Sequence, residues 1–376
     1  MQRNFHYYAT YCAAFLAGYS HPESLRIAYS AALVDFCSVT FLKELKAPTE
    51  AASTQLQMEM MEIPADRHGR QEITKIWAAF HFLPYDLYAE VKGGRRYKEK
   101  YRLICNTDSD LLVETVKLAK DESLEAAGIA LHVLADTFAH RYFAGTPSLV
   151  INNTNYHFYE DVPTEDGVVS KRVNFRHNPG KQDEPDKLLY TNTIYQMDEN
   201  SIMNLGHGRA GHLPDYSYAT YRYLPAWAGY EEYVKDNPKE FYQAFCQMVY
   251  ALKYLHGVNP DFMKGAYDTD AVEPYREEID AFMRVRDVDS DLGWKVLGER
   301  LSGEEIPDFR MDLHTGEYRE ADKKEDTVLG QFFAATIRQK RMVAQRIAES
   351  GNRIVSHRKK KGVKRNSSES EKGAGV

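Results

Sequence analysis

The sequence predicts a mainly helical protein that carries a small β-hairpin, and three observations support this fold class. Apolar residues recur with helical spacing through most of the first 145 residues and again after residue 237. Ser20-His-Pro-Glu23 has the form of a helix capping box. The alternating, β-prone segments lie between residues 155 and 175, where Pro163 and Asp166-Gly167 separate two short strands. The chain is therefore expected to form a helical core with one β insertion.

The elements are expected in the following order. An amphipathic helix over 3–17 ends at Gly18, and the capping box begins a second helix that runs to about Lys46. A polar loop over 176–187 follows the hairpin, and 188–230 is rich in tyrosine and turn signals. Further helices are expected at 70–82, 110–120, 123–144, 238–256, 272–285, 289–302 and 326–350.

This pattern predicts three parts of the chain. Residues 1–257 are expected to form a helical domain with a hairpin and loop insertion at about 152–187. Residues 258–350 carry no chemical signature and are expected to form a helical extension that serves as an oligomerisation arm or as a lid. The remaining residues, 351–376, include the basic stretch 357–365 and are expected to be a disordered tail.

Composition excludes several classes of protein. The 376 residues are 43% hydrophobic, which is enough for a sizeable core, and the net charge is −7, which disfavours a generic nucleic-acid-binding body. No run of about 18 apolar residues predicts a transmembrane helix, and no signal peptide is evident. The cysteines are widely spaced and form no Cys-x-x-Cys pair, so we expect a cytoplasmic protein with buried thiols at Cys12, Cys37, Cys105 and Cys246.

One segment, Gly128-Ile-Ala-Leu-His-Val-Leu-Ala-Asp-Thr-Phe-Ala-His-Arg-Tyr-Phe-Ala-Gly145, carries the strongest functional signal. His132, Asp136 and His140 are spaced by four residues, so in a helix they form one stripe. The surrounding residues are apolar, and the stripe is therefore expected to point inward. A carboxylate buried between two imidazoles is costly unless a cation compensates it. We expect a divalent metal there, with Gly128 leaving room for it.

Other segments supply candidate partners for this stripe. His6 lies in the first helix, Asp35 continues a face of small residues on the second, and His81 lies among aromatic residues at a helix end. A loop over 206–215 adds His207, His212 and Asp215. Imidazoles mixed with carboxylates suit zinc best, with manganese or iron as alternatives. Taken singly, each of the two helical histidines is more often a core residue, and the carboxylate has an alternative role as a helix cap or hydroxyl partner.

Two arginines, Arg141 and Arg209, are candidates to clamp a phosphate through a bidentate guanidinium, although a plain surface role is favoured for each of them. The tyrosine-rich stretch 216–233 contains Arg222. It suits stacking on a nucleobase or contact with a cationic head group, but ordinary packing beneath a long loop is the favoured explanation.

Together these motifs resemble the superfamily of zinc-dependent phospholipases C and single-strand-specific zinc nucleases, and more closely a related bacterial family of unknown function. The resemblance covers about residues 4–257 and is strongest at 128–145. Elsewhere it rests on Phe-His-Tyr-Tyr, Ala-Gly-Tyr-Ser, Val-Asp, Phe-His-Phe-Leu-Pro and Gly-His-Gly-x5-Pro-Asp. It implies a multi-helix phospholipase C/nuclease-like core that holds a cluster of zinc ions.

The resemblance also implies which residues would bind these ions. The implied sites are Asp35, His81, His132 and Asp136 for the first ion, Asp136 and His6 for the second, and His140 and His207 with either Asp215 or His212 for the third. In that superfamily the N-terminal residue binds zinc through its own amine and carbonyl. In this chain His6 lies five residues from Met1 and no leader peptide is expected. The number of ions in the centre, two or three, therefore stays open.

The expected function is hydrolysis of a phosphoester by metal-activated water, with a lipid head group, a nucleotide or a single-stranded nucleic acid as substrate. Paired cations stabilise negative charge on the phosphodiester and lower the pKa of bound water. Asp35 is the candidate catalytic group that orients or deprotonates this water. One alternative is a structural or partner-binding protein whose metal only joins its helices. Another is a metal-dependent amidase or peptidase with the same ligands, and association of copies through the C-terminal helices is a further expectation.

Overall fold

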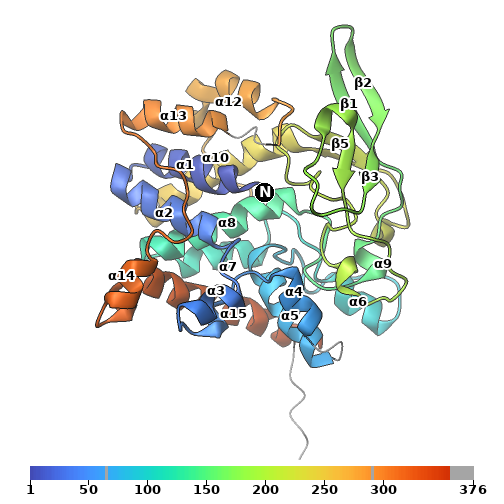
Figure 1. Ribbon diagram of the computed structural model, residues 1–376, viewed down its shortest axis with the longest axis horizontal. Coiled ribbons are helices and arrows are strands. Elements are labelled where there is room, and N and C mark those ends of the chain that lie inside the picture. The colour runs from blue at the N-terminus through green and yellow to red at the C-terminus, as the bar shows by residue number, and fades with distance from the viewer. Residues whose placement is uncertain (64–66, 289–291, 356–376) are drawn as a thin grey trace, which may run out of the picture.

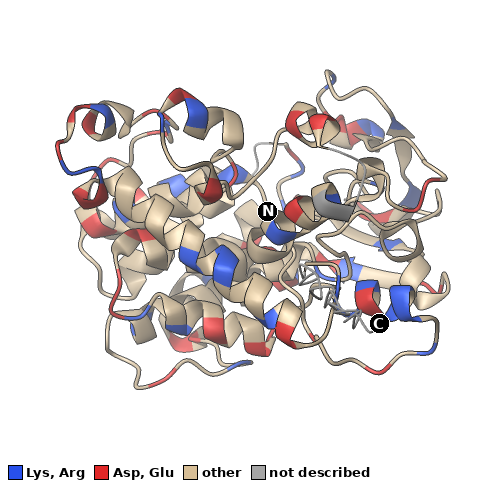
Figure 2. Cartoon of the chain, turned by 90° about the horizontal axis from the view of Figure 1, so that it is seen from below, with Lys and Arg blue, Asp and Glu red and all other residues tan. Residues whose placement is uncertain are grey.

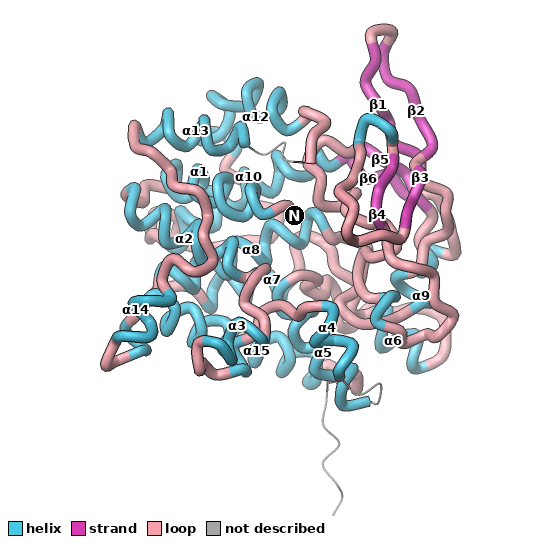
Figure 3. Tube along the Cα trace, viewed as in Figure 1, coloured by secondary structure: helices cyan, strands magenta, loops and turns pink. Residues whose placement is uncertain are grey.

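Helices are the predominant secondary structure, and the strands are gathered on one side of the molecule (Figure 1, Figure 3). The computed structural model describes residues 1–63, 67–288 and 292–355. The predicted basic tail lies outside the described residues from position 356 onward.

The prediction of a mainly helical fold is confirmed. The α-helices are α1 (Thr10–Leu16), α2 (His21–Leu33), α3 (Val39–Glu44), α4 (Gln57–Glu62), α5 (Arg67–Phe80), α6 (Arg95–Tyr101), α7 (Asp110–Leu118), α8 (Leu124–Ala139), α9 (Leu149–Asn152), α10 (Asn237–Leu255), α11 (Thr269–Val272), α12 (Arg276–Met283), α13 (Leu292–Ser302), α14 (Thr315–Glu320) and α15 (Val328–Glu349).

Helix α8 is the centre of the fold. Its apolar residues surround the whole helix, which is typical of a helix buried on all sides, and every residue from Glu125 to Ala139 is buried. The Ser123 hydroxyl caps the helix by accepting from the Ala126 amide. Helices α2, α5, α7, α10 and α15 all pack against α8. The helix ends at Ala139, earlier than the expected residue 144, and His140 is its C-cap.

Gly128 allows α2 and α8 to approach each other closely. A Cβ atom at this position would lie 2.3 Å from the Ile27 carbonyl oxygen and 2.7 Å from the Ser30 Cβ. We predicted that this glycine leaves room for a metal ion, and this was wrong. The space is filled by the backbone of α2, because only a residue without a side chain permits so short a separation.

The N-terminal part begins with a π-helical turn, Phe5–Ala9, which continues directly into α1. The predicted capping box is confirmed, since the Ser20 amide and hydroxyl both donate to the Glu23 carboxylate, at 2.9 and 2.5 Å. The expected single helix to Lys46 is instead two helices, α2 and α3. As a result Asp35 lies in the turn between them and not on a helix face.

The predicted hairpin is confirmed, and it belongs to a larger sheet. Strands β1 (Tyr159–Thr164) and β2 (Gly167–Arg172) pair antiparallel and project away from the helices (Figure 1). Strand β1 also pairs with β5 (Thr220–Tyr223), which pairs with β6 (Tyr233–Asp236), giving the order β2-β1-β5-β6. A separate parallel pair joins β3 (Asn174–Arg176) and β4 (Leu189–Thr191). The tyrosine-rich stretch therefore contains strands that the sequence did not predict.

The helices expected after residue 258 share the main hydrophobic core. Trp294 of α13, together with Phe332 and Val343 of α15, belongs to the same buried cluster as the apolar residues of α8. Gln339 of α15 donates to the Ala79 carbonyl oxygen at 3.2 Å. The apolar faces expected to form an arm or lid are therefore buried within the chain. None of the helices in the described part of the chain combines the length and apolar character that a membrane crossing requires.

We predict that Gly128→Ala lowers the free energy of unfolding by about 1–3 kcal/mol, because the added methyl group overlaps the backbone of α2. The matched control is Gly316→Ala in α14, where no atom lies within 4 Å of the added Cβ. This control should be neutral or slightly stabilising. Chemical denaturation of both variants in the same metal-loading state measures the difference. Equal stabilities would contradict the packing role of Gly128.

Candidate metal centre

Five histidines and three aspartates converge at the C-terminal end of α8, and they come from segments far apart in the sequence. His132 and Asp136 lie on α8, and the others occupy turns, loops or helix ends around it. Nitrogen and oxygen atoms of these side chains approach within 4.8 Å of one another in three groups: His6, Asp35 and His132; His81, His132 and Asp136; and His140, His207 and Asp215.

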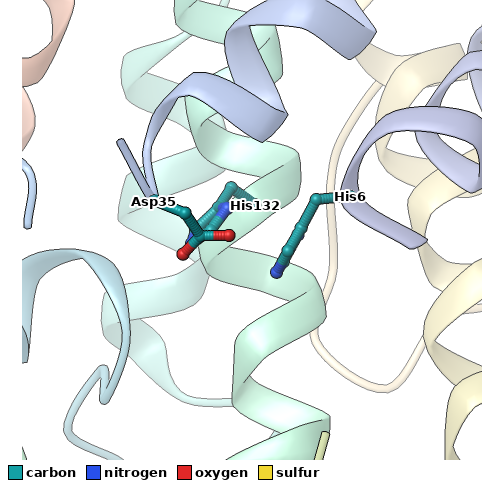
Figure 4. A group of neighbouring side chains, drawn as sticks. All are labelled: His6, Asp35 and His132. Atoms are coloured by element: carbon teal, nitrogen blue, oxygen red, sulfur yellow. The ribbon is translucent and has the colours of Figure 1, made fainter. Parts of the chain in front are cut away.

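The first group is shown in Figure 4. His6 comes from the N-terminal π-helical turn, Asp35 from the turn after α2, and His132 from the middle of α8, and their side chains point into one common space. The rings of His6 and His132 are stacked, with centroids 3.9 Å apart. Three elements thus present nitrogen and oxygen donors to one point.

Asp136 is the most enclosed group of the cluster, with a side chain only 1% exposed. Five nitrogen atoms lie within 3.4 Å of its carboxylate. They are the Met1 α-amine at 2.8 Å, His6 Nε2 at 3.1 Å, His81 Nδ1 at 3.2 Å, His132 Nε2 at 3.2 Å and His140 Nδ1 at 3.4 Å. This carboxylate is therefore the point that the three groups have in common.

Backbone carbonyl groups orient four of the five imidazoles. A carbonyl oxygen only accepts, so the ring nitrogen beside it must carry the proton. The other ring nitrogen then faces the cluster with a free lone pair, which is how histidine ligands of metals are commonly held. The bonds run from His81 Nε2 to Ser53 O at 3.1 Å, from His132 Nδ1 to Ala31 O at 2.9 Å, from His140 Nδ1 to His81 O at 2.7 Å and from His207 Nδ1 to Gly211 O at 2.8 Å.

The third group depends on the loop before β5. Asp215 Oδ1 lies 3.0 Å from His140 Nε2, and its Oδ2 lies 3.6 Å from His207 Nε2. The loop reaches this position because Gly206 has a φ of +54° and packs on the Phe82 ring, where a Cβ would lie only 2.3 Å from a ring atom. Phe82 in turn stacks on the His140 ring at a centroid distance of 4.8 Å.

Burial and charge shift the pKa values of these groups in opposite directions. Burial lowers the pKa of His6 and of His207 to about 4, so both imidazoles are neutral at pH 7. Burial also opposes the charge of the Met1 amine, yet Asp136 and Asp215 raise its pKa to about 10. Although burial opposes ionisation of Asp136, the neighbouring imidazoles and the amine hold its pKa well below the usual value. At His132 the burial effect is outweighed by Asp136 and Asp35, which raise the pKa.

The donor set fits a divalent cation. Three carboxylates face one ammonium group and one imidazole with a raised pKa, that of His132, so the cluster carries an excess of negative charge in a buried environment. The Nδ1 atom of His6 is buried and has no hydrogen-bond partner among the residues that the structure describes. Nitrogen and carboxylate donors together match zinc chemistry. The cluster is open to solvent at Asp35, which is 31% exposed, and near His207 and Asp215, at 18% and 14%.

Eight of the nine predicted metal ligands are brought together, and His212 is not. Its Nδ1 atom lies 3.0 Å from Asp183 Oδ2, which also accepts from the Tyr216 hydroxyl at 2.8 Å. His212, whose side chain is 58% exposed, therefore belongs to a separate hydrogen-bond network, and of the two alternatives it is Asp215 that lies beside His140 and His207.

The predicted phosphate clamps are engaged elsewhere. Arg141 pairs with Glu240 at 3.2 Å and donates to the Tyr142 hydroxyl. Arg209 is 2% exposed and donates to the Thr193 carbonyl oxygen at 2.6 Å. Both guanidinium groups therefore have partners outside the groups of candidate ligands.

Sequence reasoning missed a buried ion pair that supports the end of α8. Lys235 of β6 is fully buried, contacts the Glu240 carboxylate and donates to the Phe138 carbonyl oxygen at 2.7 Å. This carbonyl belongs to the last turn of α8, two residues before His140. The only sign of this pair in the sequence was a lysine in a segment of alternating residues. Such a lysine is ordinarily exposed, so it did not indicate a buried ion pair. Sequence reasoning also left open whether Met1 takes part, whereas the amine lies inside the cluster.

Comparison with known proteins assigns the chain to a family. A family model described as "Family of unknown function (DUF6765)" matches residues 1–347. The chain therefore belongs to this family, and the match includes every residue of the cluster as well as most of α15. No curated protein and no solved structure shows a match to the chain.

We predict that His207→Ala removes up to one equivalent of bound zinc, because the ring supplies a nitrogen to the third group. The matched control on the same loop is His212→Ala, which should keep the zinc content of the unsubstituted protein. Metal analysis of both purified variants after zinc loading and desalting makes the comparison. Equal loss in the two variants would show that the loop as a whole, and not the His207 ligand, determines binding.

Zinc affinity should rise with pH between about pH 6 and about pH 8. His6 and His207 have pKa values of about 4 and stay neutral over this range, so they do not make the zinc affinity depend on pH. The raised pKa of His132 means that a proton competes with the metal as the pH falls. One displaced proton changes the apparent affinity by up to about tenfold per pH unit. Titration against a competing chelator measures this, and a pH-independent affinity would contradict it.

Proposed function

We propose that this protein is a metal-dependent hydrolase of phosphoesters, related in its core to the zinc-dependent phospholipases C and single-strand-specific nucleases. The observation that carries the proposal is the sharing of ligands between groups. His132 belongs to two of the three groups, and the Asp136 carboxylate contacts side chains of all three. A cluster built in this way can place more than one cation beside a single substrate group.

Zinc ions held by these residues would lower the pKa of bound water and stabilise the negative charge that develops on phosphate oxygens. The residues of the chain define the rest of the chemistry. His81, His132 and His140 each have one ring nitrogen fixed by a backbone carbonyl, so their free nitrogens cannot turn away from the cluster. Such a preorganised donor set favours binding of the charged transition state.

We assign to Asp35 the role of orienting the attacking water molecule and accepting its proton. It is the most exposed of the three carboxylates, and its Oδ1 lies 3.8 Å from His81 Nδ1 and 3.9 Å from His132 Nε2. These distances are longer than hydrogen bonds, so its carboxylate has capacity to accept a proton. Asp136 lacks this capacity because nitrogen atoms surround it on several sides. Asp35 can therefore orient a water molecule on the open side of the cluster.

In this proposal the metal cluster itself binds the substrate phosphate. The two arginines expected to clamp it are held by Glu240 and by the Thr193 carbonyl group. The substrate class stays a phosphodiester of a lipid head group, a nucleotide or a single-stranded nucleic acid, and association of copies stays a prediction. The partial exposure of Asp35, His207 and Asp215 favours a catalytic site over a purely structural one, because structural zinc sites are closed.

We predict that Asp35→Asn lowers kcat for bis-p-nitrophenyl phosphate by about 10²-fold or more, since an amide cannot accept the proton of the attacking water. The zinc-loaded protein and the variant are assayed together, and metal analysis accompanies each assay. His212→Ala serves as the active control. Unchanged turnover with unchanged metal content would remove Asp35 from the mechanism.

The same assay separates the alternative functions. Single-stranded DNA and phosphatidylcholine identify the kind of phosphodiester, and a set of peptides and amides tests the amidase interpretation. A metal-loaded protein that turns over none of these substrates, and that unfolds when a chelator removes the metal, would indicate that the ions only join the helices.

A further inference from the structure

The hairpin formed by β1 and β2 packs little against the rest of the chain. Figure 1 and Figure 3 show that it extends beyond the helices and beyond the other strands. Every residue of β2 is exposed, and the exposed fractions of Val168 and Val169 are 69% and 45%. A two-stranded hairpin that stands alone in water is only marginally stable. Contact with a further surface would therefore stabilise it.

Strand β2 has a free edge. It is the last strand in the order β2-β1-β5-β6, so in the described part of the chain no strand pairs with its outer backbone groups. Its pairing with β1 is regular from Tyr159 and Arg172 to Thr164 and Gly167, without a bulge. The proline of the hairpin, Pro163, lies on β1 and leaves the outer edge of β2 able to pair. An exposed, regular edge of this kind is a template for another strand.

Charge is separated along the hairpin. Glu165 and Asp166 form the turn at its tip, whereas Lys171 and Arg172 lie at the other end of β2. All four side chains are exposed, and none of them forms an ion pair with another described residue. Elsewhere on the molecule acidic and basic residues are mixed (Figure 2). An antiparallel copy of β2 would place its basic end beside the acidic tip of the first copy, so the edge is complementary to itself.

A two-fold axis at Val169 brings the opposite charges together. Directly opposite residues of an antiparallel pair have their side chains on the same face of the sheet. With Val169 opposite Val169 of the second copy, Val168 lies opposite Ser170. In the same register Asp166 lies beside Arg172 of the second copy, and the symmetry creates this contact twice. Such an interface is isologous and closes as a dimer.

The rest of the molecule leaves room for this pairing. Each hairpin points toward the base of the other in an antiparallel arrangement, so the two bodies lie at opposite ends of a four-stranded ribbon. The helices that were expected to join copies do not offer a competing surface of apolar residues. Trp294, Phe332 and Val343 of α13 and α15 are buried in the main core of their own chain.

We propose that a second copy of this chain pairs antiparallel with the free edge of β2 and forms a sheet that is continuous across the two-fold axis. The proposal does not rest on the proposed hydrolase function. One short strand from each copy covers less than the roughly 1,000 Å² of a stable interface. The dimer is therefore weak and reversible, and added salt weakens it further because its ion pairs are exposed.

The test uses two charge-reversed variants of the full, zinc-loaded chain, Asp166→Arg and Arg172→Asp. Sedimentation velocity at low salt, over protein concentrations from about 5 to about 500 μM, should show a monomer–dimer equilibrium for the unsubstituted protein. Each variant alone should have an association constant lower by about tenfold or more, because two attractive contacts become repulsive. An equimolar mixture of the two variants should recover the association, since each substituted side chain then meets the opposite charge.

Matched controls lie on α14, where Glu320→Arg and Arg319→Asp make the same changes of net charge at exposed positions. Both controls should associate as the unsubstituted protein does. Zinc content and circular dichroism should agree in all five proteins, which shows that the substitutions act at the surface. A protein that stays monomeric at every concentration overturns the proposal. Variants that associate as strongly as their controls, or a mixture that recovers nothing, overturn it as well.

Discussion

The burial of one carboxylate, that of Asp136, is the constraint on which the rest of this structure depends. Its position in the middle of a helix that is otherwise apolar would cost several kcal/mol if the charge were left uncompensated. Compensation requires donors from other parts of the chain, because α8 supplies only His132 and His140 at the right spacing. The N-terminal turn and the end of α5 provide the others, including His6 and His81. The packing of these segments on α8 and the assembly of the site are thus one process.

The precision of the cluster comes from the backbone around it. Carbonyl groups of α2 and of the turns beside α8 fix the rotation of four imidazole rings. Close approach of α2 depends on Gly128, and close approach of the loop before β5 depends on Gly206. The buried pair of Lys235 and Glu240 holds the last turn of α8 from the opposite side. A displacement in any of these supports would move the ligands, so the residues that orient the cluster extend well beyond those that face it.

The parts of the site that the sequence predicted are those set by local geometry or by a polar residue in apolar surroundings. The spacing of His132, Asp136 and His140 follows from the helical repeat, and His81 stood out among aromatic residues. The choice between His212 and Asp215 could not be predicted, because it depends on loop turns with positive φ and on a partner, Asp183, from another loop. Strand β5 was missed for a similar reason, since its pairing with β1 of the hairpin is non-local and leaves little trace in a tyrosine-rich segment, and β6 in turn pairs with β5. The end of α2 was missed because no glycine or proline marks it.

The charge of the cluster sets the order of events in the proposed function. Without cations, the three carboxylates of the cluster outnumber the Met1 ammonium group and the His132 imidazole, whose pKa is raised, so the cluster repels a phosphate. In the proposed reaction, metal loading must therefore come before the phosphoester binds, because only the cations reverse the sign of the charge that the substrate meets.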